Sequence, residues 1–204
     1  MKHAINTVIF DWGGVLIDDP THAFISYCAE KLGVSEKDLY REHMKIEPLV
    51  QSGKMKEKEH WKRICRRLNV PKSRIPNASV WYQALSRSYH EKETVSFAKA
   101  LKKKGYKLGF LSNAESAGVR WFNDHRKNYS FFDARIFSVD VKTVKPKKKI
   151  YQMMLKRLKA RPEESVFIDD RIRNVKGGED AGIRSILFKS SSQLKKDLKK
   201  LGVF

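Results

Sequence analysis

The sequence predicts an α/β protein: a parallel sheet flanked by helices, with a small helical domain inserted after the first strand. Three observations lead to this fold class. Short, almost continuously apolar segments recur along the chain, as in strands that are buried on both faces. Segments with helical spacing of apolar residues separate the later strands, which is the pattern of βαβ units. A long stretch without any strand pattern follows the first strand.

Each strand is predicted from a short run of apolar and β-branched residues that ends at a polar or turn-forming residue. The first run ends at Asp11, and the fourth ends at the acid pair Asp169 and Asp170. The predicted strands are Thr7–Phe10, Tyr106–Leu111, Ala134–Ser138, Ser165–Ile168 and Arg184–Phe188.

Helices are predicted between the later strands because apolar residues recur there every three or four positions. A helix before Gly105 presents Phe97 and Leu101 on one face, and Gly105 is a plausible stop. A second helix follows Pro146, and its face contains Ile150, Met153, Met154 and Leu158. The last helix presents Leu194, Leu198 and Leu201, with preceding serines as its cap.

The stretch between the first two strands is too long for a simple crossover helix, and its pattern is helical throughout. Its predicted helices are Ala23–Leu32, Glu36–Leu49, Lys56–Leu68 and Ser79–Tyr89. Gly33, Gly53 and the stretch from Pro71 to Pro76 mark the breaks between them. We therefore predict a core domain of residues 1–18 and 90–204 and an inserted helical cap domain of residues 19–89.

Composition restricts the class of protein. With 41% hydrophobic and 11% aromatic residues, the 204-residue chain can bury a core. Cys28 and Cys65 are far apart and lack metal-ligand spacing, which favours a reducing cytoplasm. No segment approaches the roughly 20 apolar residues of a membrane-spanning helix, and no signal peptide is recognisable, so we expect no membrane partner. The sequence leaves the oligomeric state open.

The formal net charge of +20 is large for a chain of this length. Such a charge attracts nucleic acids and phosphorylated ligands. The lysines, however, are spread over many segments and lack the interleaved aromatic residues that stack on bases. We therefore favour a solvated basic surface over a nucleic-acid partner, and we interpret Lys147, Lys148 and Lys149 as the exposed start of a helix.

Polar residues follow the predicted strands at the edge where parallel sheets bind ligands. Asp11 follows the first strand, Ser112 and Asn113 the second, and Asp169 and Asp170 the fourth. Lys145 follows the third, and Asn174 lies one helical turn after the acid pair. Because each polar residue ends an apolar run and their chemistries are complementary, the sequence predicts a site at this edge.

The residue types indicate phosphoryl chemistry. Three carboxylates together suit Mg²⁺, which prefers hard oxygen ligands. A hydroxyl, an amide and a lysine are suited to the three oxygens of a phosphoryl group. A carboxylate next to the metal can attack phosphorus and form an aspartyl-phosphate. The residue types therefore predict phosphoryl chemistry at this edge of the sheet.

The motifs FDWGGVL, LSNA, VKP with IY, and FIDDRIRNVKGGEDAGI occur in this order across nearly the whole chain. In this the chain resembles the haloacid dehalogenase (HAD) superfamily of hydrolases. It is most similar to the branch with α-glucose-1-phosphate phosphatases and the N-terminal phosphatase domain of soluble epoxide hydrolases. The resemblance implies a Rossmann-like parallel sheet of strand order 54123, a helical cap inserted after strand one, and a Mg²⁺ cofactor.

The resemblance also implies roles for individual residues. Asp11 matches the nucleophile and a metal ligand, and Lys145 matches the lysine that pairs with the phosphate and the nucleophile. Asp170 matches the metal-binding acid, and Gly13 the residue whose carbonyl oxygen contacts the metal. The phosphate-binding motif matches Ser112 and Asn113, and the supporting positions match Asp169 and Asn174. From the residues alone, Asp169 also has a structural interpretation: its carboxylate would accept hydrogen bonds from the backbone rather than bind the metal.

Gly13 departs from the phosphatase pattern, because the general acid of these enzymes usually stands two positions after the nucleophile. Three interpretations remain open. The chain is a phosphatase without that acid, with Asp18 or Asp19 as partial substitutes; or it is a metal-independent 2-haloacid dehalogenase; or it is a weakly catalytic binding protein that uses its basic surface. The acid pair Asp169–Asp170 favours the phosphatase.

Residues of the insertion receive structural interpretations. We expect His22, His43, His60 and His90 to be surface residues rather than ligands. Trp12, Trp61 and Trp81 are bulky enough to shape a substrate pocket, although Trp61 and Trp81 are expected to pack within the cap. A helical cap over the sheet would enclose a small phosphorylated metabolite and exclude water. The sequence does not name that substrate.

Overall fold

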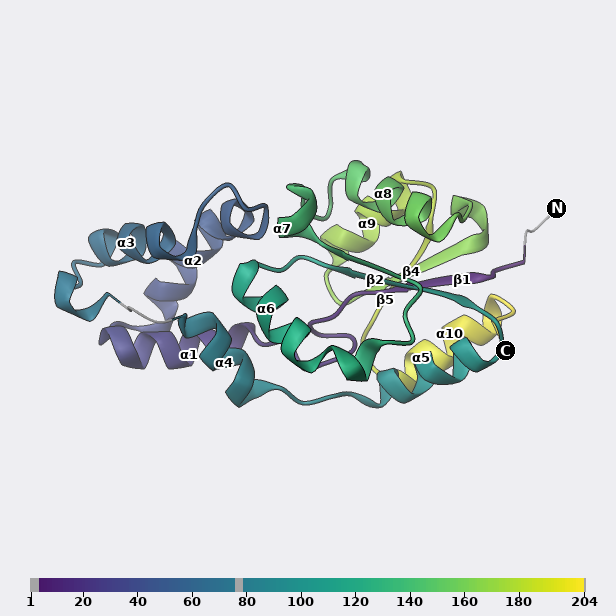
Figure 1. Cartoon of the computed structure of the whole chain (residues 1–204), viewed down its shortest axis with the longest axis horizontal. Helices are drawn as coiled ribbons and strands as arrows, with labels where there is room; N and C mark the ends of the chain where they lie inside the picture. Colours follow the sequence, from purple (N-terminus) through teal and green to yellow (C-terminus); the bar gives the residue numbers. More distant parts are fainter. Residues whose placement is uncertain (1–3, 76–78, 204) are drawn as a thin grey trace.

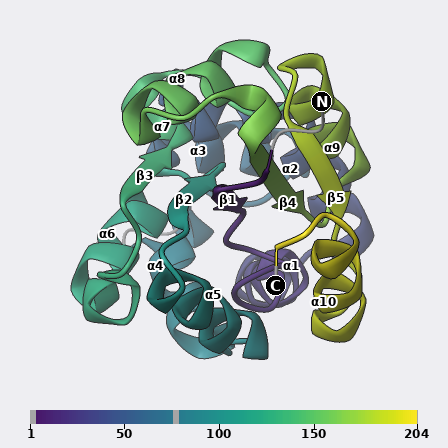
Figure 2. The same ribbon diagram turned by 90° about the vertical axis from the view of Figure 1, so that its right-hand side faces the viewer.

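A computed structural model describes residues 4–75 and 79–203 of the chain. The predicted parallel sheet is confirmed. Its order is β3-β2-β1-β4-β5, which is the predicted order 54123 read from the other edge. Figure 2 shows the strands side by side in this order. The strands are β1 (Thr7–Phe10), β2 (Lys107–Ser112), β3 (Ala134–Phe137), β4 (Ser165–Asp169) and β5 (Arg184–Leu187).

The apolar strand sequences are buried because helices cover both faces of the sheet. Val8 and Phe10 belong to the larger core cluster on one face, and Ile9 belongs to a second cluster on the other. One face is covered by α5 (Glu93–Lys103), α6 (Ser116–His125) and α10 (Ser191–Lys200). The other is covered by α8 (Lys148–Leu158) and α9 (Ile172–Asp180). Short helical turns complete the core: α7 (Ser138–Val141), η2 (Arg126–Tyr129) and η3 (Pro162–Glu164).

The predicted helical stretch after the first strand is confirmed. It contains α1 (Thr21–Leu32), α2 (Glu36–Gln51), α3 (Glu57–Arg67), η1 (Lys72–Arg74) and α4 (Val80–Ser88). Figure 1 shows these helices grouped at one end of the molecule, next to the carboxyl end of β1. Gly33 ends α1 with a φ of 66°, and Ser35 caps α2 by accepting a hydrogen bond from the backbone N–H of Asp38. Pro76, one of the predicted breaks, lies outside the described residues.

The inserted helices bury their own cluster of apolar side chains, separate from the clusters around the sheet. Phe24, Leu39, Trp61, Ile64 and Trp81 belong to it. Trp61 and Trp81 therefore pack as expected. The domain boundaries at residues 18–19 and 89–90 stay a prediction. The separate apolar cluster supports a division into a core domain and a cap domain.

The expectation that the four histidines of the insertion lie at the surface is wrong for two of them. His43 is 5% exposed and His60 is fully buried, and their rings are joined by a hydrogen bond of 2.9 Å between Nδ1 of His43 and Nε2 of His60. A sequence pattern could not show this, because each histidine is polar by type and becomes a core residue only through its partner.

Within the described ranges 4–75 and 79–203, no helix has both the length and the apolar composition that crossing a lipid bilayer requires.

Candidate active site

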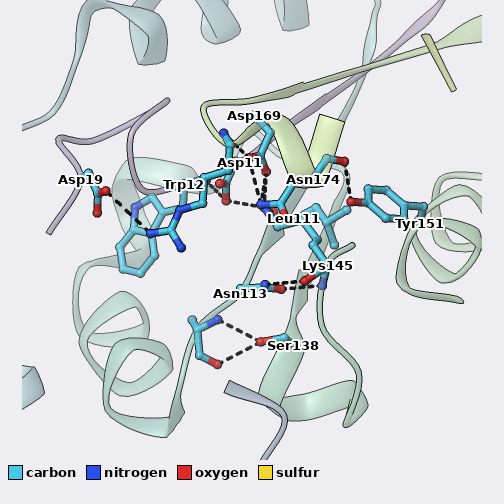
Figure 3. Close-up of polar contacts among 12 residues, drawn as sticks. Asp11, Trp12, Asp19, Leu111, Asn113, Ser138, Lys145, Tyr151, Asp169 and Asn174 are labelled. Carbon is cyan, nitrogen blue, oxygen red and sulfur yellow. Dashed lines mark hydrogen bonds and ion pairs between the residues drawn. The ribbon is translucent and has the colours of Figure 1, made fainter. Parts of the chain in front are cut away.

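The register of the sheet brings the predicted site residues to one edge. Phe10 of β1 is level with Phe110 of β2 and Ile168 of β4. The residue that follows Phe10 is Asp11, whose backbone N–H donates to the carbonyl of Ile168. Asp11 and Asp169 therefore leave neighbouring strands at the same level. Figure 3 shows their side chains pointing toward one another, with Lys145 between them.

Lys145 is the centre of the polar network. It is 2% exposed, and its Nζ lies 2.8 Å from Oδ1 of Asp11 and 2.6 Å from Oδ2 of Asp169. It also donates to the carbonyl of Leu111 at 3.0 Å. Burial alone would lower the pKa of Lys145, but Asp11 and Asp169 raise it overall. The lysine is therefore held as a cation that faces the predicted nucleophile.

Asn113 positions Lys145 through its backbone. Its side-chain oxygen accepts from the backbone N–H of Lys145 at 2.8 Å, and its Nδ2 donates to the Lys145 carbonyl at 3.1 Å. Both polar atoms of the side chain thus bind the loop that carries the lysine. A direct contact between Asn113 and phosphate stays a prediction, as does the phosphate contact of Ser112, which is 3% exposed at the end of β2.

Asp169 is fully buried, and several donors bind its two carboxylate oxygens. Oδ2 accepts from Lys145, Oδ1 accepts from the backbone N–H of Arg171 at 2.9 Å, and Nδ2 of Asn174 donates to both oxygens. Asn174 is in turn held by Tyr151, whose hydroxyl donates to the Asn174 carbonyl at 2.7 Å. These contacts agree with a positioning role for Asp169 and Asn174.

The acids of the site are close enough to share a cation. One oxygen from each of Asp11, Asp169 and Asp170 lies within 4.8 Å of the others. Burial raises the pKa of Asp11 well above its usual value, and Asp169 raises it further, while Lys145 lowers it. Burial also raises the pKa of Asp170. Three clustered carboxylates against one lysine leave negative charge that a divalent cation would offset.

The donor set fits Mg²⁺. Oδ1 of Asp170 is buried and has no hydrogen-bond partner, although such atoms are normally satisfied. Since the oxygens of Asp169 are already bound by protein donors, Asp11 and Asp170 are the acids left to hold a metal. Hard carboxylate oxygens with few protein ligands are typical of Mg²⁺ sites.

Pro20 occupies the space beside Gly13. A Cβ atom added to Gly13 would lie 3.2 Å from Cδ of Pro20, at the entry to α1. The position where related phosphatases have an acid is thus bordered by a rigid ring. The contact of the Gly13 carbonyl with a metal stays a prediction.

The two acids suggested as substitutes are already engaged. Oδ1 of Asp19 accepts from both the backbone N–H and the hydroxyl of Thr21, and Oδ2 lies 3.7 Å from Arg171. Asp18 is exposed and lies 3.5 Å from Nζ of Lys92. Asp19 lines the cavity of the site, but its carboxylate is already bound by Thr21 and faces Arg171.

A cavity of about 120 Å³ lies between the strand ends and the inserted helices. Asp11, Ser112 and Lys145 form its core side. Trp81, named above as a residue that could shape a pocket, lines the cavity, and so does His43, which was expected at the surface. The lining also contains residues that the sequence analysis did not single out: Phe24, Glu47, Glu115 and Arg171. Arg171 could have been suspected from its place after the acid pair. Glu115 could likewise have been suspected, because it lies two residues after Asn113 in the loop that follows β2. Glu47 carries no signal in the sequence, because only the packing of α2 turns it toward the cavity.

The family model of haloacid dehalogenase-like hydrolases matches residues 5–182. Bifunctional epoxide hydrolase 2 from Mus musculus is 31% identical over 143 residues, which are 65% of this chain and 24% of that protein. The chain thus spans about a quarter of the length of that relative. Pyrophosphatase PpaX from Bacillus cereus is 28% identical over 187 residues, covering 89% of this chain and 82% of that one.

Solved structures show the same fold. A HAD family enzyme from Bacteroides thetaiotaomicron has a TM-score of 0.70 at 20% identity, covering 95% of this chain and 99% of that one. The same enzyme in complex with magnesium and inorganic phosphate has a TM-score of 0.68 at 20% identity, covering 92% and 96%. A HAD phosphatase from Thermococcus onnurineus has a TM-score of 0.62 at 19% identity, covering 91% and 86%.

Proposed function

This chain belongs to the haloacid dehalogenase-like hydrolases, and within that family we propose that it is a Mg²⁺-dependent phosphatase of a small phosphomonoester. The observation that carries the proposal is the buried arrangement of Asp11, Lys145 and Asp169, of which Asp11 and Lys145 line the cavity. The magnesium and phosphate bound to the Bacteroides enzyme, and the name of the Bacillus pyrophosphatase, support phosphoryl chemistry on this fold.

Asp11 is the proposed nucleophile. Its carboxylate attacks phosphorus in line with the departing alcohol, so that the P–O bond to the alcohol breaks as the bond to Asp11 forms. Lys145 and Ser112 bind the oxygens of the transferred group, and Asp169 and Asn113 hold Lys145 in place. Water then attacks the phosphorus of phospho-Asp11, releasing inorganic phosphate and restoring the carboxylate.

Asp11, Asp170 and the carbonyl of Gly13 would hold the Mg²⁺. When bound, the ion supplies positive charge that offsets the carboxylates and the phosphate and so allows the two anions to approach. The raised pKa of Asp11 in the protein alone agrees with a need for this charge, because a protonated carboxyl does not attack phosphorus.

The departing alcohol needs a proton, and Gly13 supplies none. Asp19 is engaged by Thr21 and lies near Arg171, so it is not positioned as a free donor. We therefore propose that this phosphatase depends on the leaving ability of the alcohol more strongly than a relative with the usual acid does, since general acid catalysis contributes about 10²–10⁴-fold.

We propose that residues 19–89 form the cap domain that closes the site. The cavity of about 120 Å³ is close to the roughly 150 Å³ that hold one benzene molecule in an engineered cavity. A site of this volume takes a phosphate with a leaving group of a few atoms. A nucleotide would fit only with the helices apart.

We propose a cytoplasmic location. Cys28 and Cys65 are both free thiols and both buried, which agrees with a reducing compartment.

The test is an assay of the purified protein with p-nitrophenyl phosphate and small alkyl phosphates, with and without Mg²⁺. We expect turnover that requires Mg²⁺ and that falls at least about 10³-fold in Asp11→Asn, which removes the nucleophile. The matched control is Asp197→Asn, in α10 away from the cavity, which should retain activity.

Halide release from 2-haloacids without metal would instead indicate a dehalogenase. Absence of turnover, together with salt-sensitive binding of DNA or RNA, would indicate a binding protein.

A further inference from the structure

The far side of the cavity is acidic, although the protein is strongly basic. Apart from Asp11 and Lys145, the ionisable groups that line it are Asp19, Glu47, Glu115 and Arg171, together with His43. Burial lowers the pKa of His43 to about 4, so this histidine is neutral at pH 7. Three carboxylates thus stand against one guanidinium, in a chain with a net charge of +20. A ligand anion other than the phosphate is therefore disfavoured there.

Glu47 is a buried carboxylate, and one of its oxygens is free to accept a hydrogen bond. It is 6% exposed, and its Oε2 is buried without a hydrogen-bond partner. Oε1 accepts from Gln51 at 2.9 Å, and Arg173 lies 4.0 Å from Oε2, beyond hydrogen-bond distance. Burial raises its pKa, and Arg171 and Arg173 only partly oppose this. A buried acceptor that lines a cavity without a partner marks a place for a donor.

Glu115 faces the same cavity from the start of α6. Its Oε1 accepts from the backbone N–H of Gly118 at 3.2 Å. Burial, together with the charges of Glu57 and Glu47 in the inserted helices, raises its pKa to about 7. Because those neighbours belong to the insertion, Glu115 lies toward the leaving-group end of the cavity. A cation bound there would relieve the repulsion among these carboxylates.

Aromatic rings complete this end of the cavity. Phe24 and Trp81 both line it, with ring centroids 5.7 Å apart. The faces of such rings attract ammonium groups, and aromatic side chains combined with carboxylates are a common way to bind amines. The acidic lining, which includes the buried acceptor of Glu47, and the aromatic rings are separate features, and both favour a ligand that donates hydrogen bonds and carries positive charge.

We propose that Glu47 and Glu115, with Phe24 and Trp81, form a subsite for a cationic amine, so that the substrate is the phosphomonoester of a small amino alcohol. The inference rests on the proposed phosphatase function. Hydrolysis would place the phosphate at Asp11 and Lys145 and the ammonium group at the two glutamates. The small cavity limits the spacer between the two groups to a few atoms.

The experiment compares ethanolamine phosphate with 2-hydroxyethyl phosphate, which has a hydroxyl in place of the amine, and with phosphoglycolate, which has a carboxylate. We expect kcat/KM to be about tenfold or more higher for the amine than for the hydroxyl compound, as for a hydrogen bond to a charged group. The carboxylate compound should be the poorest. Glu47→Gln and Glu115→Gln should each reduce the ratio of amine to hydroxyl compound, mainly through KM.

Glu59→Gln is the matched control. It is the same substitution on α3, but Glu59 is half-exposed, pairs with Arg63 at 3.1 Å and does not line the cavity. The ratio of amine to hydroxyl compound should be unchanged in this variant. A wild-type preference for the carboxylate compound, or a preference for the amine that survives both cavity substitutions, would overturn the subsite.

A second measurement separates this inference from the phosphatase proposal. Calorimetry on Asp11→Asn with Mg²⁺ records binding of the same compounds without turnover. Equal affinity for the amine and hydroxyl compounds would overturn the subsite, even if hydrolysis is observed. If Glu115→Gln slows alkyl phosphates through kcat but leaves p-nitrophenyl phosphate unaffected, Glu115 is a proton donor instead, and the subsite assignment is wrong for that residue.

Discussion

Gly14 lies in the loop that follows Asp11, the proposed nucleophile. It faces Asp170, the residue that follows β4. Its φ is +81°, and a Cβ atom added there would lie 2.3 Å from Oδ2 of Asp170. A side chain at this position therefore has two consequences. It strains the backbone, and it displaces the carboxylate that is proposed to hold Mg²⁺.

Gly14→Ala tests the role of Asp170 against a control with the same backbone strain. Gly105 has a φ of +87° and open space around it, so Gly105→Ala shares only the left-handed penalty of about 1–2 kcal/mol. We expect Gly14→Ala to weaken Mg²⁺ binding at least about tenfold, measured as the metal concentration that half-saturates activity and as the Mg²⁺-induced shift in Tm. If both variants bind Mg²⁺ equally well, Asp170 does not hold the metal.

Gly13 and Pro20 allow the missing acid to be tested by substitution. Gly13→Asp and Gly13→Ala add the same Cβ atom, which meets Cδ of Pro20 at 3.2 Å, so they share the steric penalty. Only the first adds a carboxyl group. We expect Gly13→Asp to hydrolyse alkyl phosphates at least about tenfold faster than Gly13→Ala, with little difference on p-nitrophenyl phosphate, whose leaving group needs no proton. Equal rates on alkyl phosphates would show that another group already supplies the proton.

At the scale of the elements, His43 of α2 and His60 of α3 join the two helices. Burial lowers the pKa of His43 to about 4 and that of His60 to about 3, both below the usual value. The unfolded chain takes up protons below about pH 6.5, whereas the folded protein does not. The pair therefore supports stability fully above pH 6.5, and this support is lost as the pH falls toward 4.

We expect the free energy of unfolding to fall by about 2 kcal/mol for each histidine between pH 7 and pH 5. The double variant His43→Leu/His60→Leu should remove most of this pH dependence, whatever its stability at pH 7. Urea titrations followed by tryptophan fluorescence, to which Trp61 and Trp81 contribute, would measure it. His22→Leu is the control, because the His22 side chain is 88% exposed and should leave the slope unchanged. If the free energy of unfolding of the double variant depends on pH as strongly as that of the wild type, groups other than these two histidines cause the acid sensitivity.

At the scale of the whole molecule, the charge of +20 should steer anions to the site. Lys147, Lys148 and Lys149 are exposed, as expected, and they follow Lys145 and Pro146 at the start of α8. The basic surface thus extends to the edge of the sheet where the phosphate is proposed to bind, while the cap side of the cavity is acidic.

We expect kcat/KM for p-nitrophenyl phosphate to fall several-fold between about 10 mM and 1 M salt, because the screening length shortens from about 30 Å to 3 Å. The value of kcat should change little, since chemistry follows binding. Sucrose at matched viscosity controls for diffusion. A kcat/KM that is independent of salt would mean that the lysines only keep the surface solvated.

The sequence by itself determined the sheet, the order of the elements and the edge that carries Asp11, Lys145 and Asp170. These features depend on local information: apolar runs that end in polar residues, and the rule that the carboxyl ends of parallel strands share one edge. It also located the inserted helices, whose bounds differ from the predictions by only a few residues.

Tertiary structure alone decided what lies opposite Asp11. Glu47, Glu115 and the pair His43–His60 lie far apart in the chain, and their burial depends on how the inserted helices pack against one another and against α6. Periodicity shows which face of a helix is apolar, but a polar residue on that face is ambiguous until its partners are known. The proposed phosphate chemistry could therefore be predicted from motifs, whereas the proposed recognition of the leaving group required the fold.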